Sequence, residues 1–189
     1  MIEFTEFVDE ILGDFLRGQG FVRAGYEQDL VIFESASCTL TAGYDSQRSC
    51  EVFIGLNRCN ATRGPDFSFD EIIRAASVPA GLQPIGYAVS DEKSIRHLLQ
   101  TMAALLAEYC VPLLRGDYSA WSKLESQRDA DATQYAMENR VRLALNGASE
   151  AWRAKDFAKI IEILGPLKAK LGASDRAKLE YAERRLRHD

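Results

Sequence analysis

Residues 91–115 read DEKSIRHLLQTMAALLAEYCVPLLR, and this stretch decides the predicted fold. Its large apolar residues recur at intervals of three and four, which places them on one stripe of an α-helix. We therefore predict a long helix over 91–115, with Ser90 as its N-cap and with Pro112 kinking or ending it. The stripe, on which the core should be built, consists of Ile95, Leu98, Leu99, Met102, Leu105, Leu106, Tyr109 and Leu113.

An amphipathic helix and four strand-like runs precede this stretch. Residues 3–17 repeat apolar side chains at helical spacing and are followed by two glycines that allow a turn. Short polar connections join the strand-like runs, which are 21–26, 30–35, 38–44 and 49–56. The predicted fold class is α+β: an N-terminal helix and a four-stranded antiparallel meander packed on the long helix, followed by an α-helical C-terminal part.

Alternation along the third and fourth strands predicts how they pair. Successive side chains of a strand point to opposite faces, so Ala42 shares a face with Tyr44, and Cys50 shares a face with Val52. Both sets face the core if Tyr44 lies opposite Cys50 and Ala42 lies opposite Val52. That register requires a three-residue loop or a bulge after Asp45.

Between the fourth strand and the long helix, we expect two loops and one short helix. The first loop should cover 57–66. Ser68 and Glu71 have the spacing of a capping box, which predicts that a helix begins there. Residues 78–89 contain two prolines and two glycines, which exclude a regular helix and indicate a loop over the core.

The character of the sequence changes beyond Gly116, so we predict two parts, residues 1–116 and 117–189. Residues 122–133 are mostly polar, so we expect either the domain boundary or an exposed connecting helix there. Helical periodicity returns from Gln134 onward. The expected interruptions between the C-terminal helices are at Lys155-Asp156, Gly165-Pro166 and Gly172-Ala173-Ser174.

Composition is typical of a globular protein large enough for one good core or two small ones. The chain has 189 residues, of which 47% are hydrophobic and 27% charged. Its four cysteines form no C-x-x-C pair, so we interpret them as reduced thiols. No leader-like start and no apolar run of membrane-spanning length occur. We therefore expect a cytoplasmic protein without membrane association.

Charge is distributed unevenly along the chain. Residues 1–90 contain 13 acidic residues against 6 arginines and no lysine, whereas residues 91–189 contain 15 acidic and 17 basic residues. An acidic front half repels nucleic-acid phosphates and attracts basic partners, mainly by raising encounter rates. The plainer alternative is that the acidic surface only maintains solubility.

The C-terminal sequence resembles a known helical repeat. Residues 148–182 contain Ala-x-x-Ala-Trp, Lys-Asp-Phe, Ile-Ile-x-x-Leu and Leu-x-Tyr-Ala in this order. This run looks like one and a half helical hairpins of the tetratricopeptide type, with Phe157 as the turn aromatic. The resemblance implies a helical adaptor that binds a peptide, and the alternative is an ordinary helical hairpin packed on the rest of the chain.

The N-terminal part resembles a second group of proteins. A leading helix, the pair Gly20-Phe21, and a meander ending in Glu-Val-Phe-Ile-Gly-Leu at 51–56 are similar to small bacterial α+β proteins found among the immunity proteins of toxin systems. The resemblance covers residues 5–110. It implies a non-catalytic protein that binds another protein.

The sequence contains no recognised catalytic, cofactor or metal signature. Its two histidines are His97 and His188, and no nucleophile motif accompanies His97. Cys50 and Cys59 have no histidine near them and do not have the spacing of a zinc site. The basic residues of 176–187 alternate with glutamates, which favours an ion-paired surface over nucleic-acid binding. We expect no cofactor and no bound metal.

The leading functional hypothesis is therefore a non-enzymatic bacterial protein-binding factor, immunity- or antitoxin-like, whose acidic N-terminal module binds a basic protein. The candidate partner-binding residues are Asp45 and Arg48, which flank a hairpin tip. A helical adaptor with a groove near Tyr135 and Trp152 is the first alternative. An enzyme whose site is assembled from distant residues is the second. The sequence leaves the oligomeric state open.

Overall fold

The computed structural model describes residues 3–27, 29–59 and 66–188, and it divides into two compact units. Unit 1 ends at Arg128 and unit 2 begins at Asp129. The sequence predicted the division at 116/117. The difference arises because Trp121 and Leu124, which follow the predicted boundary, are buried in the core of unit 1.

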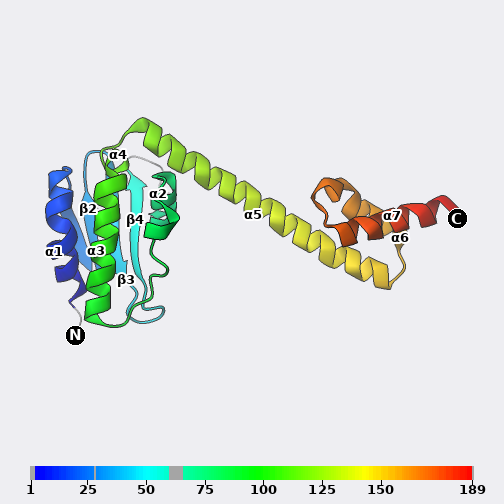
Figure 1. Ribbon diagram of the computed structural model, residues 1–189, viewed down its shortest axis with the longest axis horizontal. Coiled ribbons are helices and arrows are strands. Elements are labelled where there is room, and N and C mark those ends of the chain that lie inside the picture. The colour runs from blue at the N-terminus through cyan, green and yellow to red at the C-terminus, as the bar shows by residue number, and fades with distance from the viewer. Residues whose placement is uncertain (1–2, 28, 60–65, 189) are drawn as a thin grey trace. The chain divides into compact units, whose positions relative to one another are not determined.

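Unit 1 is an antiparallel sheet with helices packed on one face (Figure 1). The strands are hydrogen-bonded in chain order, β1 to β5. The elements are α1 (Phe4–Gly18), β1 (Val22–Glu27), β2 (Leu30–Glu34), β3 (Cys38–Tyr44), β4 (Val52–Arg58), β5 (Phe67–Ser68), α2 (Phe69–Ala75), the 3-10 turn η1 (Ala80–Leu82), α3 (Glu92–Tyr109), α4 (Val111–Leu114) and the first part of α5 (Tyr118–Arg153). The predicted α+β class and the antiparallel meander are confirmed.

The sheet contains one strand more than predicted. β5 pairs with β4 through Leu56 opposite Phe67 and Gly55 opposite Ser68. It has two residues, too few for an alternating pattern to be visible in the sequence. Of the predicted loop 57–66, residues 60–65 lie outside the described residues.

The predicted face of β3 and β4 is right, but the predicted register is wrong by two residues. Tyr44 lies opposite Val52, and Ala42 lies opposite Ile54. The connection is longer than three residues because Asp45 closes it: its carbonyl accepts from the Cys50 amide at 2.8 Å. Cys50 turns the chain there with a φ of 53°. A shift of two residues keeps every side chain on its face, so the apolar pattern could not detect the error.

The long predicted helix is two helices. α3 ends at Tyr109 and α4 begins at Val111, with Cys110 as the non-helical residue between them and Pro112 in the first turn of α4. The N-cap of α3 is Asp91 instead of Ser90, because the Asp91 carboxylate accepts from the Ser94 amide at 2.9 Å. The stripe is otherwise as predicted, with its residues from Ile95 to Leu106 buried against the sheet.

The helices of unit 1 share one core with the inner face of the sheet. α1 contributes Phe4, Val8 and Leu12, all fully buried. Trp121 from α5 closes one end of this core, and its indole N–H donates to the Leu113 carbonyl at 2.9 Å. Burying Trp121 fixes the beginning of α5 to unit 1, since a fully buried indole requires both apolar neighbours and a partner for its N–H.

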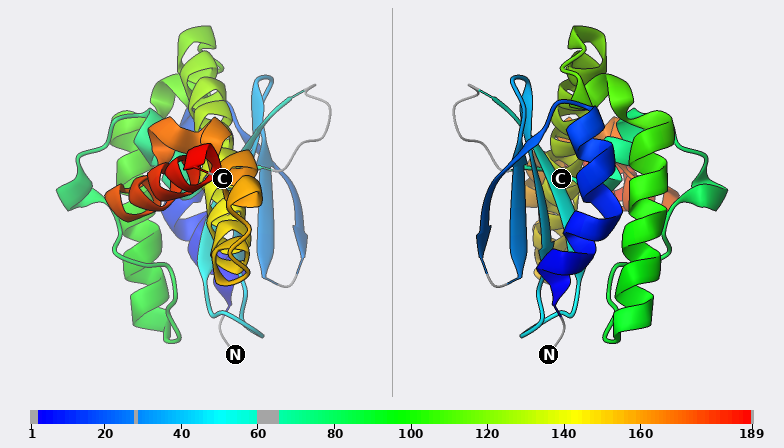
Figure 2. Two further views of the ribbon diagram at one scale, coloured as in Figure 1. Left: turned by 90° about the vertical axis from the view of Figure 1, so that its right-hand side faces the viewer. Right: turned by 90° about the vertical axis from the view of Figure 1, so that its left-hand side faces the viewer.

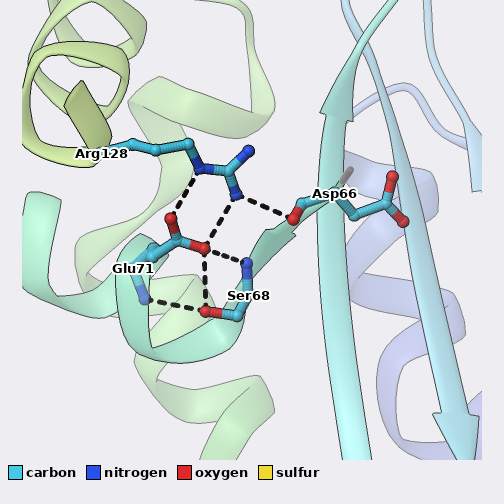
Figure 3. A network of polar contacts seen from close by, with 4 residues as sticks. All are labelled: Asp66, Ser68, Glu71 and Arg128. Carbon is cyan, nitrogen blue, oxygen red and sulfur yellow. Dashed lines mark hydrogen bonds and ion pairs between the residues drawn. The ribbon is translucent and has the colours of Figure 1, made fainter. Parts of the chain in front are cut away.

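The predicted capping box at the start of α2 is confirmed, and it is extended by a residue from α5. The Ser68 hydroxyl accepts from the Glu71 amide, and the Glu71 carboxylate accepts from the Ser68 amide at 2.8 Å. Arg128 donates to both carboxylate oxygens of Glu71, at 2.7 and 2.9 Å, and to the Asp66 carbonyl at 2.8 Å (Figure 3). Its guanidinium also lies 3.6 Å from the Phe67 ring centre. Through these contacts Arg128, the last residue of unit 1, connects α5 to α2.

We expect Glu71→Gln to destabilise unit 1 in a pH-dependent way. Hydrogen bonds from Arg128 lower the pKa of Glu71 from 4.5 to about 2, with help from Ser68 and against the opposing effect of burial. A lowered pKa stabilises the fold above pH 4.5, and this stabilisation is lost as the pH falls toward 2. Glutamine keeps the capping bond to Ser68 but removes the charge. The loss should be about 1–2 kcal/mol at pH 7 and smaller at pH 3, measured by urea denaturation.

Glu125→Gln is the matched control. Glu125 of α5 also forms an ion pair with a residue of the sheet, Arg58 of β4, at 3.3 Å, but its side chain is more exposed than that of Glu71. Its effect should be below about 0.5 kcal/mol. An equal loss for both variants, or a Glu71→Gln loss that does not change with pH, would contradict the assignment.

Unit 2 is a small helical unit with its own core. It contains the later part of α5, then α6 (Phe157–Leu164), the 3-10 helix η2 (Gly165–Lys170) and α7 (Ala173–His188). The predicted interruptions are confirmed, and Asp156 caps α6 by accepting from the Lys159 amide. The buried residues of this core are Ala148, Ala151, Ile160, Leu164, Leu167, Leu171, Leu179 and Ala182.

Residues 129–136 form a helical stretch of α5 in which every side chain is exposed. Helical structure without packed side chains opens locally at low free-energy cost. We therefore expect chymotrypsin to cut the native chain first after Tyr135, which is 70% exposed. Mass spectrometry of early time points checks this, and a first cut within the sheet would contradict it. In Tyr135→Ala the early cut should disappear.

Within the described part of the chain, no helix is both long and apolar enough to cross a bilayer.

Candidate protein-binding surface

Within unit 1, no described helix covers the outer face of the sheet, since all the helices of this unit pack on the inner face (Figure 2). We call this surface the open face. Strand pairing and alternation define its residues. In β1 to β4 they are Val22, Gly25 and Glu27 of β1, Leu30, Ile32 and Glu34 of β2, Thr39, Thr41 and Gly43 of β3, and Phe53, Gly55 and Asn57 of β4.

The open face carries exposed apolar side chains. Val22 is 66% exposed and Phe53 is 44% exposed, while Leu30 and Ile32 lie half-buried between them. The Phe53 ring lies across Gly43, because a Cβ atom added there would fall 2.1 Å from the ring. Glycine at position 43 therefore leaves the space that the end of the Phe53 ring occupies.

Acidic groups accompany this apolar surface. Glu27 and Glu34 are exposed on the open face. The Asp66 side chain lies over Gly55 on the same face, with its carboxylate accepting from the Asn57 amide group at 3.0 Å. Among the outward-facing residues of β1 to β4 there is no lysine or arginine. The face therefore presents carboxylates without an opposing cation on its strands.

The charge of the chain follows the division into units. Residues 1–128 contain 18 acidic and 11 basic residues, and residues 129–189 contain 10 acidic and 12 basic residues. The negative field of unit 1 extends beyond the open face and falls off over about 8–10 Å at physiological salt. It favours approach of a positively charged partner to this unit.

Asp45 and Arg48 lie in the β3–β4 connection, and Asp45 is used to hold that connection. Its carboxylate accepts from the Arg48 amide at 3.1 Å and from the Ser49 hydroxyl at 3.2 Å. Burial acts to raise the pKa of Asp45, but the bonds from Ser49, Arg48 and Gln47 hold it below its ordinary value. The Arg48 side chain is exposed. Asp45 therefore shapes the loop, and Arg48 is the member of the pair that can reach a partner.

Tyr135 and Trp152 are not brought together. Both lie on α5, where a rise of 1.5 Å per residue separates them by about 25 Å. Tyr135 belongs to the exposed stretch 129–136. Trp152 is 37% exposed and packs against the rings of Phe157 and Tyr181, with ring centres 6.2 and 5.4 Å away. Its contacts are those of an aromatic cluster that joins the three helices of unit 2.

The groups considered for chemistry lie apart from one another. His97 is exposed on α3. Burial raises the pKa of the Cys110 thiol to about 12 and that of Cys38 to about 11, so both remain protonated and unreactive at neutral pH. Within the described ranges, no three histidine, cysteine, aspartate or glutamate side chains are grouped so that they could hold a metal ion.

Sequence reasoning missed the residues of the open face, although β2 contained a signal for them. Residues 30–33 are all apolar, whereas a strand with one solvent-facing side normally alternates apolar and polar residues. Val31 and Phe33 are buried, and Leu30 and Ile32 point outward. Apolar residues on both faces of β2 indicate that the open face also makes apolar contacts.

No family model, no curated protein and no solved structure matches this chain.

Truncation of two neighbouring residues of β4 should destabilise the protein to very different degrees. Ile54 is fully buried in the core, whereas Phe53 lies on the open face. We expect Ile54→Ala to cost about 2–5 kcal/mol of unfolding free energy and Phe53→Ala less than about 1 kcal/mol. Urea denaturation followed by circular dichroism checks both. Comparable losses would mean that Phe53 is a structural residue, and the open face would then lose its central apolar contact.

Proposed function

We propose that this chain is a protein-binding factor whose open face binds a basic protein partner. The observation that carries the proposal is the open face itself: Val22 and Phe53 are exposed, and the nearby carboxylates have no cation among the outward strand residues. Burying the apolar side chains supplies affinity. The carboxylates supply orientation and a faster encounter.

The open face has an uncharged centre and acidic edges, and both suit a protein interface. Interface centres are depleted of charge and enriched in aromatic residues, and their rims are polar. Phe53 and Ile32 form an uncharged centre, and Glu27 and Glu34 stand at opposite ends of β1 and β2 around it. A partner with exposed apolar residues flanked by lysine or arginine complements this arrangement.

The N-terminal resemblance to immunity proteins favours an immunity-type role for this binding. In such a role, the chain would bind a basic toxin and block its action, without catalysis by the chain itself. The excess of acidic residues in unit 1 supports this form, because a strongly basic toxin would associate rapidly with an acidic inhibitor. The resemblance supports binding to another protein, and the charge separately supports a basic partner.

The test uses Glu34→Lys on the open face and Glu108→Lys as the matched control. Both residues are exposed in unit 1, and both substitutions change the net charge equally. The immobilised full chain is incubated with lysate of its own source at about 50 mM and about 300 mM salt, a range over which screening increases strongly. Retained proteins are identified by mass spectrometry, and the affinity of the purified partner is then measured.

We expect one basic protein to be retained by the wild type and by Glu108→Lys, and to bind Glu34→Lys about tenfold or more weakly, which corresponds to about 1.4 kcal/mol. Phe53→Ala should weaken the same complex. A retained partner that is acidic, or that binds all variants equally at both salt concentrations, would refute the proposal.

A helical adaptor is the second candidate function, and a groove in unit 2 favours it. The groove has a volume of about 400 Å³ and lies between α5 and Lys170 of η2. Met137, Val141 and Leu145 line it with apolar side chains, and Arg142 and Glu138 are charged residues of its lining. A partner whose affinity falls with Arg142→Glu but not with Glu34→Lys would support this candidate over the first.

A further inference from the structure

The segment 79–89 is a loop on the helical side of unit 1, anchored at both ends. At its beginning, the Gln83 side chain donates to the Val78 carbonyl at 2.8 Å. At its end, the Val52 amide donates to the Tyr87 carbonyl at 3.0 Å, and the Val89 amide donates to the Cys50 carbonyl at 2.8 Å. The tip between these anchors projects from the helical layer (Figure 2). It is therefore a presented loop whose ends are fixed.

The tip is apolar and exposed, within a run that contains no charge. Residues 75–90 contain no Asp, Glu, Lys or Arg, in a chain of which 27% is charged. Ile85 is fully exposed and Leu82 is 50% exposed. Large aliphatic side chains presented on an anchored loop, with no charge beside them, have the character of an interface centre.

A groove of about 640 Å³ lies between this loop and α3. Leu82, Pro84, Ile85, Val89 and Leu98 provide its apolar lining. The ionisable residues of the lining are Lys93 and His97, and no carboxylate belongs to it. The lining itself therefore offers a lysine and no carboxylate, while Asp91 and Glu92, which precede Lys93 in the chain, lie outside the lining.

The polar groups of the groove differ in what they can offer a ligand. The Ser94 hydroxyl donates to the Asp91 carboxylate at 2.6 Å, and the Thr101 hydroxyl donates to the His97 carbonyl at 3.0 Å. The Asp91 carboxylate is thus directed at Ser94 and the start of α3. Lys93 is exposed at the edge of the groove and can hold an anionic group there.

We propose that this groove binds a short apolar peptide segment that bears a carboxylate, with its side chains against Leu82 and Ile85 and its carboxylate at Lys93. The charge of the lining selects the anionic end, and the uncharged loop selects the apolar part. A peptide fits better than a compact small molecule, because the site is walled by one loop and one helix and does not enclose its occupant. This surface lies on the helical side of the sheet, so the proposal does not depend on the open face.

The test measures fluorescence anisotropy of two labelled peptides added to the full chain. The acidic probe is Leu-Ile-Phe-Leu-Glu with a free carboxyl terminus, and the basic probe is Leu-Ile-Phe-Leu-Lys with an amidated terminus. The variants are Ile85→Asp and Lys93→Glu, with Leu143→Asp as the control for an exposed aliphatic residue elsewhere. Circular dichroism verifies that each variant is folded, which we expect because all three side chains are exposed.

We expect the acidic probe to bind the wild type and Leu143→Asp alike, and to bind Ile85→Asp and Lys93→Glu at least about tenfold more weakly. The basic probe should bind the wild type at least about tenfold more weakly than the acidic probe does. Equal binding of the two probes would overturn the role of Lys93. Binding that is insensitive to Ile85→Asp, or equally sensitive to Leu143→Asp, would overturn the site.

Discussion

The packing of one layer of helices on one face of the sheet is the constraint on which the rest of unit 1 depends. In unit 1, α1 and α3 each carry one apolar stripe, and both stripes pack against the inner face of β1 to β4. Among the described elements of unit 1, none is left to cover the outer face. The outward side chains therefore do not belong to the core, and their identity is not set by core packing. Their mixture of exposed apolar and acidic groups is the basis of the proposed binding role.

The beginning of α5 completes unit 1 by two kinds of contact. Trp121 fills the end of the core with a fully buried indole, and Arg128 reaches Glu71 and the Phe67 ring. Glu71 serves two structures with one carboxylate, because it closes the capping box of α2 and accepts the guanidinium of α5. After Arg128, α5 continues through exposed residues into the separate core of unit 2.

Unit 1 presents two surfaces of different chemistry on the two sides of its sheet. The open face combines Phe53 and Val22 with carboxylates, whereas the groove beside α3 combines Leu82 and Ile85 with Lys93. Complementary partners for these surfaces have opposite charge, so a single segment would not satisfy both. If both proposals hold, the unit can bind a basic protein on one side while an acidic apolar segment occupies the other.

The sequence by itself determined most of the elements and the inner face of β3 and β4. The helical stripe from Ile95 to Leu106, the alternation of β3 and the capping box of Ser68 and Glu71 are local patterns. Each involves residues close together in the sequence, so it can be recognised without knowing which distant residues meet. Tertiary structure alone decided the register of β3 against β4, the addition of β5 and the assignment of Trp121 to the first core. A shift of two residues leaves the pattern of faces unchanged, and a buried tryptophan is distinguished from an exposed one only by what packs around it. The open face and the groove belong to this second class, since each combines residues that are distant in sequence and adjacent only after the strands pair and the loop docks.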